Sequence, residues 1–329
     1  MYALNPDLFT ENVVLEPIRA GFGRGLRAAG ESNELVVALC ADLTESTQMH
    51  LFKEAFPKRF IEMGVAEQNL VTVASGMARA GKIPFTSSYA AFSPGRNWEQ
   101  IRTTIALNNQ PVKVVGSHAG VSVGPDGATH QMLEDIALMR VLPNMIVVAP
   151  GDSLEAEKAT QLIAENGKPT YLRLAREKTP IISTADTPFE IGKAYVVREG
   201  KDVSLFGTGA MTYELLVAAN ILADQGIDAE VVHVPTIKPL DEETILASAK
   251  KTGRVITAEE AQINGGFGSA IAEFLSETLP MPVKRFGMQD RFGESGAPKE
   301  LFDHFGLTGA KMAEQIIAWA AVTHRYHQE

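Results

Sequence analysis

The stretch Leu35-Val36-Val37-Ala38-Leu39-Cys40-Ala41 contains only apolar residues, and Asp42-Leu43-Thr44-Glu45-Ser46 follows it directly. An unbroken apolar run of this length is typical of a parallel strand that is covered on both faces. Polar residues that follow such a strand lie at the carboxyl edge of the sheet, where open α/β sheets bind ligands. The stretch therefore predicts a buried parallel strand that ends at a site.

The same arrangement recurs along the first half of the chain. Strand-length runs lie at residues 83–87 before Tyr89 and Phe92, 111–115 before His118, 145–149 before Asp152, and 170–174 before Arg176. Apolar residues at helical spacing lie between or before these runs, at residues 18–29, 97–107, 132–141 and 153–165. This alternation predicts a doubly wound α/β sheet whose polar residues gather along one edge.

A second, smaller α/β unit is predicted after a linker. Residues 178–190 are rich in Thr, Pro, Ser and Asp and lack apolar periodicity, which is typical of a connection between domains. Strands are then predicted at residues 203–206, 229–234, 254–258 and 283–286, and helices at 213–225, 241–250 and 268–277. A chain of 329 residues gives two domains room for a full core each, and we expect them at residues 1–186 and 187–329.

The composition excludes several classes of protein. Hydrophobic residues make up 45% and charged residues 21%, as in ordinary soluble globular proteins. The net charge of −10 and the lack of a basic cluster argue against non-specific binding of nucleic acid. No apolar stretch approaches the roughly 20 residues that span a bilayer, and residues 1–17 lack the pattern of a signal peptide. The single Cys40 cannot form an internal disulfide. We therefore expect a cytoplasmic protein that binds neither nucleic acid nor membrane.

One acid stands out in the stretch Met63-Gly64-Val65-Ala66-Glu67-Gln68-Asn69. The apolar residues after it recur at helical spacing, so Glu67 is predicted in the first turns of a largely buried helix. A buried carboxyl group favours its protonated form and can share a proton near neutral pH. A glutamate near a helix N-terminus is also stabilised by the helix dipole without any catalytic role. Spacing alone leaves both interpretations open.

The histidines leave a similar choice. His118 follows a predicted strand, and His130 ends the turn-rich stretch Gly124-Pro125-Asp126-Gly127-Ala128-Thr129-His130, so both are predicted at the same sheet edge. A structural and a catalytic histidine are equally compatible with this placement. The sequence contains no zinc-type histidine pair, no thiolate cluster and no Gly-x-Ser-x-Gly elbow. Gly21-Phe22-Gly23-Arg24-Gly25 follows no strand, so it predicts close helix packing instead of a dinucleotide site.

Several segments nevertheless resemble one family in order and in sequence. They are Asp42-Leu43-Thr44-Glu45-Ser46, Gly64-Val65-Ala66-Glu67-Gln68, Pro84-Phe85-Thr86-Ser87-Ser88-Tyr89, Gly124-Pro125-Asp126-Gly127-Ala128-Thr129-His130-Gln131 and Arg291-Phe292-Gly293-Glu294-Ser295-Gly296. Over nearly its whole length the chain resembles the thiamine diphosphate enzymes, and transketolase most closely. The resemblance implies a pyrimidine-binding domain followed by a transketolase C-terminal domain.

The resemblance also implies roles for individual residues. Glu67 would be the acid that activates the aminopyrimidine ring, with Asp42, Tyr89 and Phe92 in the same cofactor pocket. His118 and His130 would be catalytic and line the substrate channel, with Asp126 near a sugar hydroxyl. Arg19, Ser46 and Arg176 would hold the sugar phosphate. A third aromatic residue that the family places in the pyrimidine pocket falls on Gly95 here.

The activity implied is transfer of a two-carbon ketol unit from a ketose phosphate to an aldose phosphate through a thiamine diphosphate carbanion. In the family, a separate N-terminal domain holds the diphosphate and its Mg²⁺, and neither Gly124-Pro125-Asp126-Gly127 nor Gly151-Asp152-Ser153 matches that motif in the right setting. We therefore expect no metal ligand in this chain and a partner subunit that supplies the diphosphate and magnesium site, in an assembly with two copies of each. Self-association through the two-fold interface is also expected.

Two other functions remain as alternatives. The β subunit of a 2-oxo acid dehydrogenase has similar length and layout, although residues 126–130 and 292–296 favour transketolase. A non-catalytic scaffold is the third candidate, and the joint presence of Glu67, His118, His130 and Arg176 argues against it.

Overall fold

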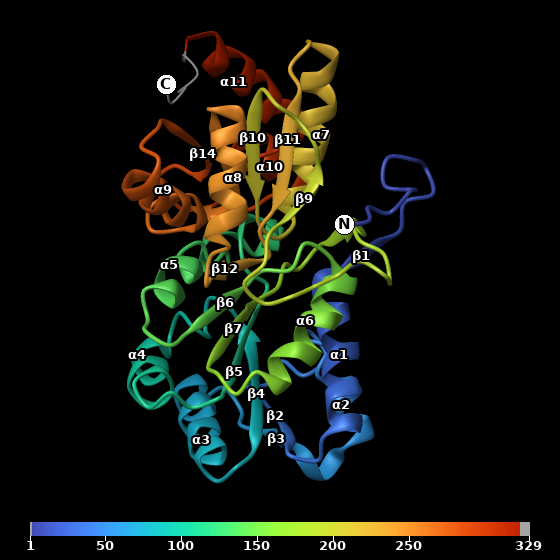
Figure 1. Ribbon diagram of the computed structural model, residues 1–329. Helices are drawn as coiled ribbons and strands as arrows, with labels where there is room; N and C mark the ends of the chain where they lie inside the picture. The colour runs from blue at the N-terminus through green and yellow to red at the C-terminus, as the bar shows by residue number, and fades with distance from the viewer. Residues whose placement is uncertain (1, 323–329) are drawn as a thin grey trace.

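The computed structural model describes residues 2–322, and its first part is built on a seven-stranded sheet (Figure 1). The strand order is β12-β6-β7-β5-β4-β2-β3, and every neighbouring pair is parallel except β12 with β6. The strands are β2 (Val36–Cys40), β3 (Phe60–Glu62), β4 (Ile83–Tyr89), β5 (Lys113–Ser117), β6 (Ile146–Val148), β7 (Thr170–Arg173) and β12 (Thr236–Lys238). The predicted doubly wound α/β sheet is confirmed.

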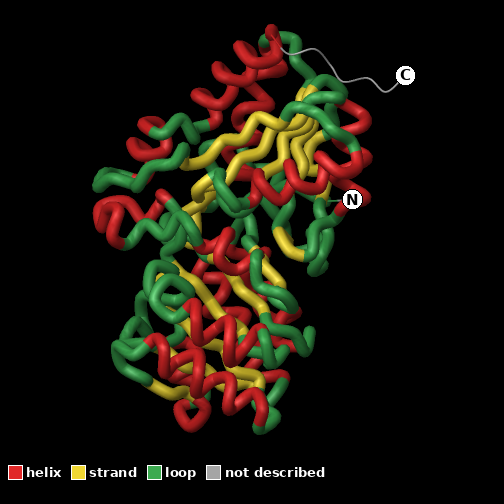
Figure 2. The backbone as a smooth tube through the Cα atoms, turned by 90° about the vertical axis from the view of Figure 1, so that its left-hand side faces the viewer, coloured by secondary structure: helices red, strands yellow, loops and turns green. Residues whose placement is uncertain are grey.

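Helices cover both faces of this sheet (Figure 1), and Figure 2 shows one of the two helical layers in front of the strands. They are α1 (Ile18–Ser32), α2 (His50–Ala55), α3 (Glu67–Arg79), α4 (Trp98–Gln100), the π-helix η2 (Ile101–Ala106), α5 (Asp135–Arg140) and α6 (Ser153–Glu165), with 3-10 turns η1 (Pro57–Arg59) and η3 (Val121–Thr129) between them. The predicted helix at residues 97–107 is therefore divided into α4 and η2, and the one predicted from residue 132 begins only at Asp135.

Strand β2 is buried on both faces, as its unbroken apolar sequence predicts. Leu39 belongs to the same hydrophobic core as Leu70 of α3, whereas Ala38 belongs to the core that contains Phe22 of α1. Successive side chains of a strand point to opposite faces, so a strand between two helical layers has no polar position.

The glycines of α1 allow it to pack closely on α6. A Cβ on Gly21 would lie 1.7 Å from the carbonyl oxygen of Ser153, and one on Gly25 would lie 2.6 Å from that of Glu157. Neither separation is compatible with a side chain, so the predicted role of these glycines in helix packing is confirmed.

The second part is a smaller α/β unit with a five-stranded sheet of order β14-β13-β10-β11-β9, in which only β9 is antiparallel. Its strands are β9 (Tyr195–Arg198), β10 (Val203–Gly207), β11 (Ala229–His233), β13 (Val255–Gln262) and β14 (Val283–Met288). Its helices are α7 (Met211–Asp224), α8 (Glu242–Thr252), α9 (Phe267–Thr278), α10 (Pro298–His304) and α11 (Gly309–Val322). The four strands predicted here are present; β9, α10 and α11 were not predicted.

The two units are joined by more than the linker. Strand β12 belongs to the second half of the sequence, yet it pairs antiparallel with β6 at the edge of the first sheet. Part of the predicted linker also forms a strand, β8 (Lys178–Pro180), which pairs with β1 (Leu15–Pro17). Because the chain returns to the first sheet after entering the second, the domain limits 1–186 and 187–329 stay a prediction.

The N-terminal residues lie on the second unit. Leu8 belongs to its hydrophobic core, and the ring of Tyr2 lies 5.3 Å from that of Tyr195, centroid to centroid. The Tyr2 hydroxyl donates to Glu155 of α6 at 2.8 Å, and the other oxygen of this carboxylate lies 2.7 Å from Nε2 of His233 in β11. The buried carboxylate of Glu155 thus links α6 to β11 of the second sheet through a hydrogen bond.

Candidate active site at the carboxyl edge of the first sheet

The ends of β4 and β5 bring Tyr89 and His118 into contact. In the parallel register Tyr89 is opposite Ser117, so the ring of the next residue, His118, reaches that of Tyr89. The two rings stack with centroids 3.9 Å apart. Two residues from separate predicted strands therefore meet at one edge, as the topology of a doubly wound sheet requires.

Phe92 and His130 complete the ring cluster. The Phe92 ring lies 6.2 Å from that of Tyr89 and 5.5 Å from that of His130, centroid to centroid. His130 directly follows η3, which begins four residues after the end of β5. The four predicted residues Tyr89, Phe92, His118 and His130 thus gather in one place, while their roles stay predictions.

Hydroxyl groups orient both imidazoles. Ser117 Oγ lies 2.9 Å from Nδ1 of His118, and Thr129 Oγ1 lies 2.9 Å from Nδ1 of His130. His118 has a φ of 55°, a left-handed conformation that is uncommon outside glycine and asparagine and often marks a functional site.

The charge state of His118 follows from its surroundings. Burial, and then the positive charges of Arg19 and Arg176, lower the pKa of His118 to about 3. The imidazole is consequently neutral at physiological pH and can accept a hydrogen bond.

Two arginines lie beside the ring cluster. Nη1 of Arg19, in the first turn of α1, donates to the carbonyl oxygen of Arg176, and Nη1 of Arg176 donates to the carbonyl oxygen of Val123 at 2.6 Å. Burial, and then the charge of Arg176, lower the pKa of Arg19, whose buried Nε has no hydrogen-bond partner in the described structure. Two neighbouring guanidinium groups, one with an unused donor, form a place suited to a small anion.

Glu67 is the first residue of α3, and only 3% of its side chain is exposed. Its Oε2 lies 2.8 Å from Nη1 of Arg96, and its carbonyl oxygen accepts from Nδ2 of Asn97 at 2.8 Å. A hollow of about 180 Å³ adjoins the carboxylate and is lined by Val65, Ala66, Glu67, Gln68, Asn69 and Arg96. The predicted burial of Glu67 at a helix start is confirmed, but its pairing with a guanidinium was not predicted.

Close backbone packing explains the glycine at position 95, next to Arg96. The Arg96 guanidinium lies 4.8 Å from the centroid of the Phe92 ring. A Cβ on Gly95 would lie 2.2 Å from the carbonyl oxygen of Ala91, so no side chain fits there. Arg96 therefore covers the ring beside a position where an aromatic residue is excluded.

The remaining predicted residues lie around this edge with fewer contacts. Asp42 follows β2 with a φ of 58° and an exposed side chain, Ser46 is half-buried in the turn before α2, and Asp126 is exposed on η3. Within residues 2–322, no hydrogen bond or ion pair joins Ser46 to Arg19 or Arg176. The structure thus gathers seven of the ten predicted residues closely and leaves these three at the margin.

Glu62 was missed at the sequence level and holds two parts of the edge together. Its Oε1 accepts from the backbone N–H groups of Asp42 and Gly64, at 2.8 and 2.9 Å, and its Oε2 accepts from Thr44 Oγ1 at 3.1 Å. The only signal in the sequence was an acid at the end of a short run before Gly64, which is too weak to identify this role.

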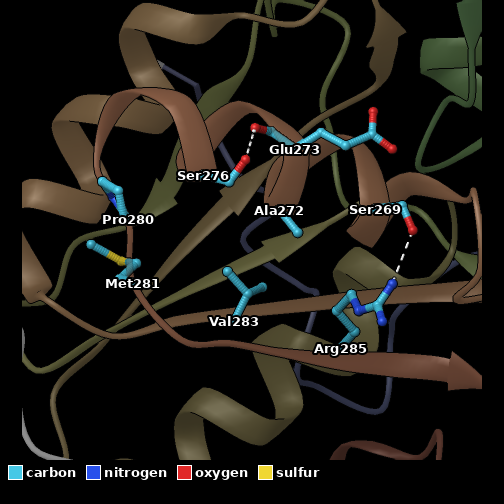
Figure 3. Close-up of a pocket in the computed structure, with 8 residues that line it drawn as sticks. All are labelled: Ser269, Ala272, Glu273, Ser276, Pro280, Met281, Val283 and Arg285. Carbon is cyan, nitrogen blue, oxygen red and sulfur yellow. Dashed lines mark hydrogen bonds between the residues drawn. The ribbon is translucent and has the colours of Figure 1, made fainter.

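Other hollows lie on different elements. One of about 430 Å³ lies between α9 and β14, where Arg285 donates to Ser269 at 2.9 Å beside Glu273 and Met281 (Figure 3). None of the predicted site residues lines it. Within residues 2–322, His, Cys, Asp and Glu side chains form no group of three or more that could hold a metal ion, and no helix is long and apolar enough to cross a membrane.

Comparison with known proteins identifies the class to which this fold and site belong. Residues 17–181 match the transketolase pyrimidine-binding domain, and residues 192–312 match the transketolase C-terminal domain. The chain belongs to the transketolase family, whose members depend on thiamine diphosphate.

Two proteins and one solved structure are similar to this chain over most of its length. A protein from Methanocaldococcus jannaschii named "Putative transketolase C-terminal section" is 44% identical over 92% of this chain and 96% of its own length. The 6-deoxy-6-sulfo-D-fructose transketolase subunit SqwH from a Clostridium species is 44% identical over 86% of this chain and 88% of its own. A solved structure described as "Split gene transketolase, inactive beta4 tetramer" has a TM-score of 0.87 and 43% identity, covering 94% of this chain and 99% of its own.

Proposed function

We propose that this chain is the C-terminal subunit of a two-polypeptide transketolase, which transfers a two-carbon ketol unit between sugar phosphates. The observation that carries the proposal is the meeting of Glu67, two aromatic rings, two histidines and two arginines at one sheet edge. A scaffold would have no use for a neutral, strained histidine beside a pair of guanidinium groups.

The residues present fit one end of thiamine diphosphate. A buried carboxylate beside a hollow, with the Phe92 ring nearby, suits an aminopyrimidine ring, which offers an apolar face and hydrogen-bonding nitrogens. Glu67 would accept a hydrogen bond from a ring nitrogen, Tyr89 and Phe92 would pack on the ring, and Asp42 would lie near it. When bound, the cofactor supplies the electron sink that allows the carbon–carbon bond beside a ketose carbonyl to break.

The remaining residues would act on the sugar. Neutral His118 can accept a hydrogen bond from a sugar hydroxyl, and His130, across the same ring cluster, is the better placed of the two to exchange a proton with the sugar. Asp126 would bind a hydroxyl group, while Arg19 and Arg176, with Ser46, would hold the terminal anion. That anion is a phosphate in our proposal; a sulfonate, as the name of the Clostridium relative implies for its own substrate, has similar geometry and is the second candidate.

The diphosphate and Mg²⁺ would be held by a separate subunit, in an assembly with two copies of each chain. This part of the proposal is supported by the split-gene relative, whose β4 tetramer is described as inactive. In such an assembly the two halves of each site come from different chains across a two-fold axis.

The test is to purify this chain and a candidate N-terminal subunit, separately and mixed, with thiamine diphosphate and Mg²⁺. We expect ketol transfer between sugar phosphates only from the mixture, with light scattering showing two copies of each chain. Transfer by the isolated chain would contradict partner dependence, whereas decarboxylation of pyruvate by the mixture would indicate the dehydrogenase β subunit. A parallel assay with 6-deoxy-6-sulfo-D-fructose separates a sulfonate substrate from a phosphate substrate.

A further inference from the structure

Residues 120–130, which begin three residues after β5 and end at His130, contact the second domain. Oε2 of Glu260 in β13 accepts a hydrogen bond from the backbone N–H of Ser122 at 3.0 Å, although 138 residues separate the two in sequence. A Cβ on Gly120 would lie 2.4 Å from the same oxygen. The Glu260 carboxylate is therefore in close contact with the backbone at the start of this loop.

The middle of the loop contacts another segment of the second domain. A Cβ on Gly127 would lie 2.4 Å from Oγ of Ser295, and one on Gly124 would lie 3.1 Å from Cγ of Pro298. Both glycines have positive φ, of 71° and 79°. Only a glycine combines this conformation with so close an approach, so the loop is shaped to lie against residues 295–298.

Gln131 links the end of the loop to the same segment. Its Nε2 donates to the carbonyl oxygens of Val121, at 3.1 Å, and Glu294, at 3.0 Å. The first bond joins the two ends of the loop to each other, and the second ties them to the second domain. The Arg291–Gly296 motif, which has no place in the chemistry at the sheet edge, gains a structural role from this contact.

Glu260 belongs to a buried charged group that crosses between the two sheets. Arg173 of β7 donates from Nη2 to the Glu260 carbonyl oxygen at 3.1 Å and from Nε to Asp135 at 2.8 Å, while its Nη1 lies 3.9 Å from Oε1 of Glu260. Tyr171 donates to the same Asp135 oxygen at 2.8 Å. Burial raises the pKa of Glu260, and Arg173 opposes that effect. The carboxylate is therefore held through Oε2, which accepts from Ser122, while its buried Oε1 has no hydrogen-bond partner within residues 2–322 and faces the Arg173 guanidinium at 3.9 Å.

We propose that the second domain acts as a clamp on residues 120–130, with Glu260 as a positioning residue that sets the loop carrying Asp126 and His130. Any displacement of the loop is passed to His130, because its backbone N–H donates to the Gly127 carbonyl oxygen at 3.0 Å. The importance of this clamp for catalysis rests on the proposed function of the loop. The contacts that form the clamp do not depend on that function.

The first test measures amide hydrogen exchange at residues 120–131 in the full chain, without partner or cofactor. Glu260→Ala removes the acceptor of the Ser122 N–H, and we expect exchange in the loop to become roughly three- to tenfold faster, as for the loss of one buried hydrogen bond. Glu260→Gln keeps an oxygen acceptor and should restore slow exchange. The control is Glu214→Ala, which removes a carboxylate that accepts the Gly309 N–H at 2.6 Å elsewhere in the same domain.

A second variant avoids any change at the buried charge. A Cβ at position 293 would lie 1.8 Å from Oε1 of Gln131, so Gly293→Ala should displace the amide that ties the loop. It should speed exchange at the same amides, whereas Gly76→Ala, where a Cβ meets no atom within 4 Å, should not. Unchanged loop exchange in folded Glu260→Ala, or in folded Gly293→Ala if the former does not fold, overturns the clamp.

Activity of the assembled enzyme tests the function assigned to the loop independently of the clamp itself. We expect Glu260→Ala to lower kcat/KM for a ketose phosphate by about tenfold and Glu260→Gln to recover most of it. Faster loop exchange with unchanged kcat/KM would support the clamp and would contradict the role proposed for the loop in catalysis.

Discussion

Nη1 of Arg96 lies 2.8 Å from Oε2 of Glu67, and the same guanidinium lies 4.8 Å from the centroid of the Phe92 ring. Half of the Arg96 side chain is exposed, whereas Glu67 is almost completely buried. The half-exposed guanidinium of Arg96 therefore forms an ion pair with a carboxylate that is buried away from water. Arg96 contacts the same acid and the same ring that we assign to the aminopyrimidine, so under our proposal the arginine and the cofactor would compete for part of the site.

Arg96→Met should strengthen binding of thiamine diphosphate to the assembled enzyme. The competing guanidinium is half exposed, so its removal should lower Kd only about two- to fivefold, in line with the value of exposed ion pairs. Titration calorimetry of cofactor into the mixed subunits measures this. Arg102→Met, a change of an exposed arginine in η2, should leave Kd unchanged. Weaker binding in Arg96→Met would show that Arg96 assists the cofactor.

Glu67→Gln should lower kcat of the assembled enzyme by about 100-fold or more, a normal loss when a group that handles a proton is removed. Glutamine has nearly the same shape as glutamate, so the thermal unfolding temperature should change little. Glu99→Gln, at an exposed glutamate of α4, is the matched control. Near-normal turnover of the Glu67 variant would remove this residue from the proposed role.

Arg176→Ala should raise KM for phosphorylated sugars by about ten- to a hundredfold, as expected for a lost charge-assisted contact. Unphosphorylated analogues should be affected much less. Because Arg176 also donates to the Val123 carbonyl oxygen, the substitution can loosen the loop as well. An equal rise in KM for both kinds of substrate would therefore assign Arg176 to loop support instead of phosphate binding.

His118 should make folding sensitive to acid. Its folded pKa of about 3 lies below the unfolded value of roughly 6.5. Between these values the unfolded chain binds the extra proton, so this contribution to the free energy of unfolding is lost as pH falls from about 6.5 towards 3. Urea unfolding over this range should show a shallower pH dependence for His118→Asn, which tolerates the positive φ. An identical dependence in both proteins would contradict the neutral, buried imidazole.

Several elements of the fold could be predicted because local sequence decides them. Strand β2 has no polar position, since helices cover both of its faces, and Gly21 and Gly25 mark the contact between α1 and α6. Strand β12 could not be predicted. It has only three residues, and it is a strand because β6 offers an unpaired edge, which no local pattern in its own sequence records.

The sequence by itself determined which chemical groups reach the edge of the first sheet. Parallel strands that pair in one sheet end side by side, so Tyr89 and His118 are neighbours in any correct pairing of β4 with β5. Only the tertiary structure decided what surrounds these groups: Arg96 against Glu67, Glu62 between Asp42 and Gly64, and Glu260 against the loop before His130. Except for Glu62 with Gly64, these contacts join residues that are 20 to 138 positions apart, and hydrophobic periodicity contains no information about such pairs.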